Sequence, residues 1–185
     1  MVSVRIPDNN VNERKYILDI ILGEFLGLEF ELSVGSQDYE IELENKQVLT
    51  IKDTFFNKYP NDLEYLKLEN IPKEIEELDI FAASFFMLTR WEEYVNRNRD
   101  NHDRFPANES FAFKNNFLDR PIVNEYLEIL KILLLQLDCG LTFKQYKFTK
   151  NISCDVDIPY ETYTQSVIKT IKKVAGDIVK RKNIK

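Results

Sequence analysis

Two aspartates, Asp155 and Asp157, stand two residues apart near the carboxyl end of this chain of 185 residues. They follow residues 146–149, whose alternating and β-branched side chains favour a strand, and Pro159 removes a backbone donor just beyond them. Residues two apart in a strand point to the same side, so the two carboxylates would converge. Acids at the carboxyl end of a strand are typical of catalytic sites in α/β folds. The alternative is a turn and N-cap role before a helix that begins near Tyr163.

A second group of polar residues lies in the segment from Thr89 to Tyr94, where an apolar sequence changes abruptly to Arg, two acids and two amphipathic aromatics. In one interpretation, Arg90 and Glu93 line a cleft for a polar ligand. In the other, the segment is a charged helix end with Trp91 packed on the core and Arg90 paired to an acid.

The chain contains a single histidine, His102, which lies between Asp100 and Asp103 in a polar stretch. A histidine beside two acids can serve as a metal ligand or a general acid. Because no second histidine is present, we predict a surface residue or one that tethers its loop.

Composition excludes several classes of function. The net charge of −6 argues against broad binding of nucleic acid. The basic residues from Lys169 to Lys185 could bind a membrane surface or an anionic polymer, or could form a solvated helix face. The first residues lack the apolar run of a signal peptide, and no apolar stretch is long enough for a transmembrane segment. Two cysteines without metal or disulfide spacing suggest reduced thiols, so we expect a soluble cytoplasmic protein.

Hydrophobic periodicity predicts an α+β fold with a small sheet and packed helices. The expected elements are a strand at residues 2–6, a helix from Asn12 to Gly27, an antiparallel meander over 28–34, 39–43 and 48–51, a helix from Pro72 through Tyr94, a polar loop over 96–116, and a helix from Pro121 to Leu137. Residues 80–88 are apolar nearly all round, as in a helix covered on most sides. We expect a first domain over residues 1–145 and a strand and helix over 146–185.

Several stretches together resemble one family. They are ERKYILD (13–19), EFLGL (24–28), DIFAASFFMLTRWEEY (79–94), RFPA (104–107) and FLDRPIVNEY (117–126). These resemble the amino-terminal region of bacterial polysaccharide deacetylase-like proteins. In such proteins a domain of uncharacterised role precedes a NodB-like, metal-dependent deacetylase barrel, which begins with a strand that carries an aspartate-rich motif.

Cys154-Asp155-Val156-Asp157 stands at the place of that motif. The resemblance implies that one acid is the general base and the other a ligand of a divalent metal such as zinc; we assign Asp155 as base and Asp157 as ligand, with the opposite assignment open. The chain departs from the family pattern in three ways: Val156 separates the acids, Cys154 replaces a histidine, and the paired-histidine metal motif is absent. By this comparison the chain is truncated within the first βα unit of the barrel.

The resemblance therefore implies the amino-terminal part of a carbohydrate deacetylase that hydrolyses N-acetyl groups on a glycan. The chain alone is expected to be inactive and to bind no metal tightly, because a catalytic metal needs about three fixed protein ligands. The alternative is a non-catalytic accessory domain that binds a glycan or a protein partner.

Overall fold

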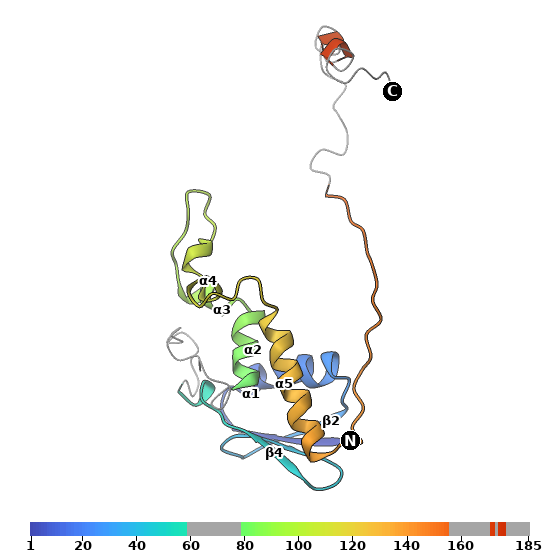
Figure 1. Ribbon diagram of the computed structural model, residues 1–185. Coiled ribbons are helices and arrows are strands. Elements are labelled where there is room, and N and C mark those ends of the chain that lie inside the picture. Colours follow the sequence, from blue (N-terminus) through green and yellow to red (C-terminus); the bar gives the residue numbers. More distant parts are fainter. Residues whose placement is uncertain (59–78, 156–170, 173, 177–185) are drawn as a thin grey trace. The chain divides into compact units, whose positions relative to one another are not determined.

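A computed structural model describes residues 1–58, 79–155, 171–172 and 174–176. The chain divides into two units, Met1–Tyr146 and Lys147–Lys185 (Figure 1). Three predicted features lie outside the described residues: the start of a helix at Pro72, Asp157, and most of the helix after Tyr163.

The first unit is built on a four-stranded mixed sheet. Its strands are β1 (Val2–Ile6), β2 (Phe30–Val34), β3 (Tyr39–Glu42) and β4 (Val48–Ile51), in the order β2-β1-β3-β4. The predicted strands are confirmed, but the predicted meander is wrong, because β1 lies between β2 and β3. β1 runs parallel to β2 and antiparallel to β3. A parallel pair needs a crossover connection, and the helical segment between β1 and β2 supplies it.

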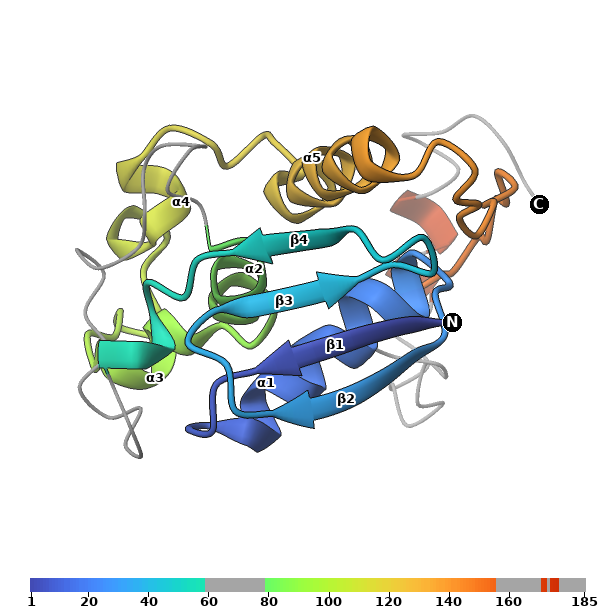
Figure 2. The ribbon, with the colours of Figure 1, turned by 90° about the horizontal axis from the view of Figure 1, so that it is seen from below.

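The sheet buries one of its faces. In β1, Val2, Val4 and Ile6 are buried and alternate with exposed residues. Tyr39 and Ile41 continue the buried row across β3. Figure 2 shows α1 and α2 behind the sheet, so the buried face is the one that the helices cover, and the core lies between these two layers.

The crossover begins as an α-helix and ends as a wider one. It comprises α1 (Val11–Leu18) and the π-helix η1 (Asp19–Phe25), where the amide of Leu26 bonds the carbonyl of Ile21, five residues back. In this segment Ile17 and Ile21 are buried, whereas the side chain of Tyr16 is exposed. Ile17 and Leu18 in α1 and Ile21 and Leu22 in η1 are buried at a spacing of four residues, so one buried stripe continues across both parts.

The predicted central helix is confirmed as α2 (Ile80–Leu88), in which every residue from Ile80 to Phe86 is buried. It is shorter than expected. Asp79 has non-helical backbone angles and caps the helix, so α2 begins at Ile80. At the other end, Arg90 has a positive φ of 55° and separates α2 from α3 (Trp91–Val95).

The rest of the first unit contains a short turn after β4 and a helical segment at its carboxyl end. The turn is the 3-10 helix η2 (Phe56–Lys58). The polar stretch after α3, predicted as a loop, contains two short helices, η6 (Ala107–Glu109) and α4 (Phe111–Lys114), the second capped by Ser110. α5 (Ile122–Leu137) follows Pro121 as predicted and buries Leu127, Leu130 and Leu134.

The strand predicted to begin at residues 146–149 and to end before Pro159 is not present in its described part. Residues 147–155 have no regular secondary structure, and their side chains are exposed. A β-strand is stabilised by hydrogen bonds to a neighbouring strand, and the described β-branched residues here form no such pairing. Sequence preference alone therefore does not produce the strand.

Candidate functional site

The predicted catalytic acid Asp155 lies in the second unit, on an exposed segment without secondary structure. Cys154 beside it is a free, exposed thiol. Asp157 is outside the described residues, so the convergence of the two carboxylates remains a prediction. Within the described residues, no group of three His, Cys, Asp or Glu side chains is placed to hold a metal ion.

Arg90 and Glu93 are brought together by the turn between α2 and α3. The guanidinium donates from Nε to Oε1 at 2.6 Å and from Nη2 to Oε2 at 2.7 Å, and the Arg90 side chain is 73% exposed. An exposed ion pair of this kind stabilises a fold little. The contact with Glu93 uses Nε and one N–H of Nη2, so the remaining N–H groups of this exposed guanidinium are available to a polar ligand. The cleft itself remains a prediction.

The other acid of this segment has a different environment. Glu92 is buried, and its Oε2 accepts a hydrogen bond of 2.5 Å from the amide of Phe111, which joins α3 to the start of α4. Burial raises the pKa of Glu92, although the bond from Phe111 opposes the rise. Sequence reasoning singled out Glu93, whereas Glu92 is the acid that the fold encloses.

His102 lies at the surface of the loop after α3. Its backbone amide donates to Oδ1 of Asp100 at 2.7 Å, and Asp100 also binds the backbone and side chain of Arg104. These bonds lower the pKa of Asp100 and hold the turn. Asp100, rather than the histidine, organises this loop.

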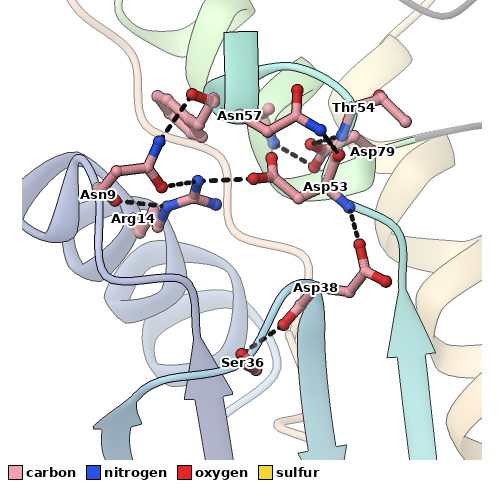
Figure 3. A network of polar contacts seen from close by, with 10 residues as sticks. Asn9, Arg14, Ser36, Asp38, Asp53, Thr54, Asn57 and Asp79 are labelled. Carbon is pink, nitrogen blue, oxygen red and sulfur yellow. Dashed lines mark hydrogen bonds and ion pairs between the residues drawn. The ribbon is translucent and has the colours of Figure 1, made fainter. Parts of the chain in front are cut away.

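A buried polar cluster around Arg14 was not predicted from the sequence (Figure 3). Arg14 on α1 and Asp53 after β4 are both fully buried, and Nη2 of Arg14 lies 2.7 Å from Oδ2 of Asp53. The guanidinium also donates to the carbonyl and side-chain oxygens of Asn9, at 2.8 and 2.7 Å. Its planar group lies over the rings of Tyr39 and Phe56, about 5 Å from each ring centre. Arg14 therefore joins α1 to the sheet and to the segment that follows it.

Asp79 contributes a second carboxylate to this region. Its oxygens accept hydrogen bonds from the amide of Ala82 at 2.9 Å and from the amide of Thr54 at 3.2 Å, so it caps α2 and holds the segment after β4. Burial raises the pKa of Asp79 to about 7, with the charge of Asp53 adding to the rise and the two backbone bonds and Arg14 opposing it. Asp79 consequently gains or loses its proton near neutral pH.

Three buried polar atoms of this cluster make no hydrogen bond in the part of the chain that the structure describes: Nη1 of Arg14, Oδ1 of Asp53 and the hydroxyl of Tyr39. Burial raises the pKa of the Tyr39 hydroxyl well above its usual value, so this hydroxyl stays protonated. Buried polar groups are ordinarily paired, and leaving one unpaired is costly. The cluster is enclosed by aromatic side chains, and we infer that its role is to hold α1, the sheet and the segment after β4 together. The sequence contains one signal of this cluster. Arg14 stands three and four residues before the apolar Ile17 and Leu18, so a helix places it on their face.

The segment before the aspartates is anchored on η1. The amide of Lys144 bonds the carbonyl of Leu26 at 2.9 Å, its ammonium bonds the carbonyl of Glu24 at 3.0 Å, and the hydroxyl of Tyr146 bonds the same carbonyl at 2.8 Å. The last carbonyls of a helix have no partner within it, and these groups satisfy them. Gly27 permits the contact, because a Cβ there would lie 2.7 Å from Cβ of Lys144.

Comparison with known proteins places the first unit in a family. Residues 2–138 match the model of a family of unknown function, DUF7033, and the chain belongs to that family. No curated protein and no solved structure matches the chain. Among the described residues, no helix is both long and apolar enough to cross a membrane.

Proposed function

We propose that this chain is the amino-terminal part of a metal-dependent carbohydrate deacetylase, in which residues 1–146 form a non-catalytic module and the catalytic acids follow it. The observation that carries the proposal is the position of Cys154-Asp155-Val156-Asp157. The motif begins after both the family match, which ends at residue 138, and the first unit, which ends at Tyr146. The acids therefore belong to a different part of the protein from the family domain.

One property of Asp155 supports its assignment as the general base. Its side chain is exposed and lies on a segment without regular secondary structure, where water can reach it. An ionised carboxylate within hydrogen-bonding distance of a water molecule can accept its proton, and a divalent metal such as zinc polarises an acetyl carbonyl. The described residues do not supply the three ligands that the metal needs. Asp157 and residues beyond the described ones would have to complete the site.

The module itself is held together by groups that are unsuited to catalysis. Its enclosed charges, Arg14 and Asp53, are fully buried and paired with each other. Its exposed pair, Arg90 and Glu93, can contact a glycan at the surface. We therefore assign residues 1–146 a role in supporting the catalytic unit or in contacting its substrate.

The proposal is tested first on the gene and then on the protein. The reading frame downstream of Lys185 should encode a pair of metal-binding histidines. Protein made from the complete frame should release acetate from N-acetylated oligosaccharides in the presence of zinc. Asp155→Asn and Asp157→Asn should abolish this release, whereas Asp119→Asn, on an exposed residue of the first unit, should leave it unchanged.

One result would contradict the proposal, and a second would contradict only the expectation that the metal site is incomplete in this chain. A stop codon directly after Lys185 would favour an accessory domain that binds a glycan or a protein partner. The second result would come from calorimetric titration of the 185-residue chain with zinc. We expect no affinity tighter than about micromolar, because two carboxylates leave the ion most of its water. Tighter binding that disappears in Asp157→Ala would mean that the chain already contains a complete site.

A further inference from the structure

We propose that β2 pairs with β2 of a second copy of this chain, edge to edge and antiparallel, so that two four-stranded sheets become one continuous sheet. The sheet has two edges, β2 and β4. In Figure 2, α5 lies beside β4, and Asn45 in the turn before β4 donates to the carbonyl of Leu137 at the end of α5. In the same view, no described element lies along the outer edge of β2. Within the described residues, β2 is thus the open edge.

The backbone of β2 presents alternate residues to a partner. The amide of Val2 bonds the carbonyl of Glu29, and the amide of Gly35 bonds the carbonyl of Ile6. In a parallel pair with this register, Glu31 and Ser33 direct their backbone groups toward β1. Phe30, Leu32 and Val34 consequently direct their N–H and C=O groups outward, where a second strand can accept and donate hydrogen bonds.

The side chains of β2 lack the features that usually protect an edge strand. Phe30 and Leu32 are half-buried, and Val34 is 53% exposed, so apolar surface remains open on the side that the helices cover. The strand contains no lysine and no proline, which are common means of preventing edge pairing. Pairing with another strand would cover this surface and satisfy the outward backbone groups together.

The sequence of β2 is complementary to itself in one antiparallel register. With the two-fold axis at Leu32, all five residues find partners: Leu32 faces Leu32, Phe30 faces Val34, and Glu31 faces Ser33 of the second copy. An aromatic residue opposite a β-branched one is a favourable pair. An axis at Glu31 would place two glutamates opposite each other, and an axis at Phe30 would place Glu31 opposite Glu29. Like charges therefore oppose those two registers.

Charges on the exposed face agree with the register centred on Leu32. Arg5 on β1 is the neighbour of Ser33 across the parallel pair. Glu31 of the second copy would lie just beyond Ser33, about 10 Å from Arg5 along the same row, since strands are spaced about 4.8 Å apart. Arg5 is paired with Glu40 of β3 at 3.2 Å, and Glu31 of the second copy would add a more distant acid on its other side. A second copy therefore fits this edge in backbone direction, in side-chain pairing and in charge.

The contact is small, so the dimer should be weak. Three pairs of outward-directed residues would exchange about six backbone hydrogen bonds. A five-residue strand buries less surface than the roughly 1,200 Å² at the low end of stable interfaces. We expect a reversible equilibrium between monomer and dimer that depends on protein concentration.

Sedimentation velocity on the whole chain, from about 10 μM to about 1 mM, tests the proposal. The wild type should shift from monomer toward dimer across this range. Ser33→Glu should weaken association about tenfold or more, because it places glutamates opposite each other twice. Ser33→Lys should strengthen association several-fold by facing Glu31. The double variant Glu31→Lys with Ser33→Glu should restore the dimer, since opposite charges again face each other.

Thr50→Glu and Thr50→Lys are matched controls, because Thr50 is exposed in β4 and pairs with Glu40 in the row that contains Arg5 and Ser33. Neither change should alter the dissociation constant, and circular dichroism should show that every variant folds. A chain that stays monomeric throughout the concentration range overturns the proposal. A dimer whose dissociation constant is unchanged in both Ser33 variants also overturns the proposal, because another surface would then form the dimer. Neither outcome affects the proposed deacetylase function.

Discussion

Replacing Arg14 by methionine is the most direct test of how the first unit is held together. The substitution keeps an unbranched side chain of similar length and removes the guanidinium. Asp53 then loses its partner while both side chains are fully buried. Breaking a buried ion pair from one side costs about 3–5 kcal/mol, because the remaining charge is uncompensated. The bonds to Asn9 are lost as well. Since a domain is typically stabilised by about 5–15 kcal/mol, the variant should be severely destabilised.

Urea denaturation of wild type, the single variants Arg14→Met and Asp53→Leu, and the double variant Arg14→Met with Asp53→Leu measures this effect. The double variant should be more stable than Arg14→Met alone, because replacing both members of a buried pair by apolar residues is often close to neutral. The loss in Arg14→Met should also be smaller at pH 5 than at pH 8. Removing Arg14 takes away a group that lowers the pKa of Asp79, and a protonated carboxyl needs no counter-charge.

Two results would refute this reasoning. One is a loss of less than about 1 kcal/mol in Arg14→Met, which is the size of ordinary surface changes. The other is a double variant whose loss equals the sum of the two single losses. Additivity of that kind would mean that Arg14 and Asp53 do not act as a pair.

Three further predictions concern the core and the anchored segment. The folded-state pKa of Asp79, about 7, exceeds its unfolded value of about 3.9. The stability that Asp79 contributes is therefore present below pH 4 and is lost as the pH rises toward 7. Asp79→Asn should flatten this pH dependence in denaturation curves. Phe85→Ala should cost about 3–5 kcal/mol, against under about 1 kcal/mol for the exposed Phe113→Ala, and equal losses would place Phe85 outside the core. Gly27→Ala should lower the melting temperature because of its φ of 70° and its contact with Lys144, whereas Gly23→Ala, with open space around it, should not.

The sequence predicted those elements whose stability comes from their own apolar pattern. Residues 80–88 are apolar on all sides, so any compact fold must cover them, and α2 is indeed buried from Ile80 to Phe86. α5 was predicted equally well, because its apolar stripe is regular and Pro121 marks its start. In both cases the local pattern and the tertiary structure favour the same conformation.

The order of the strands could not be predicted in the same way. Short connections between residues 28 and 51 favoured a meander, but β1 lies between β2 and β3. Hydrogen bonds from the amides of Gly35 and Ser36 to the carbonyl of Ile6 keep the connection between β2 and β3 close to the end of β1. Which strand lies in the middle is decided by pairing between distant segments, and the periodicity of a single strand contains no information about it.

The candidate site was predictable only in part for a related reason. Arg90 and Glu93 are three residues apart, and the sequence alone suggested a paired arginine, which the structure confirms. Arg14 and Asp53 are separated by 39 residues and meet only through the packing of α1 against the sheet. Local spacing reveals partners that are close in sequence, whereas partners brought together by tertiary structure require the fold.

The anchored segment decides where the module ends. The family match stops at residue 138, yet Lys144 and Tyr146 bond carbonyls at the end of η1, and the first unit extends to Tyr146. A chain cut at residue 138 would leave those carbonyls to water and remove the side chain that packs on Gly27. Beyond Tyr146, residues 147–155 are exposed up to Asp155. The structural boundary therefore falls after Tyr146, and the aspartate motif begins only a few residues later, in the unit to which we assign the chemistry.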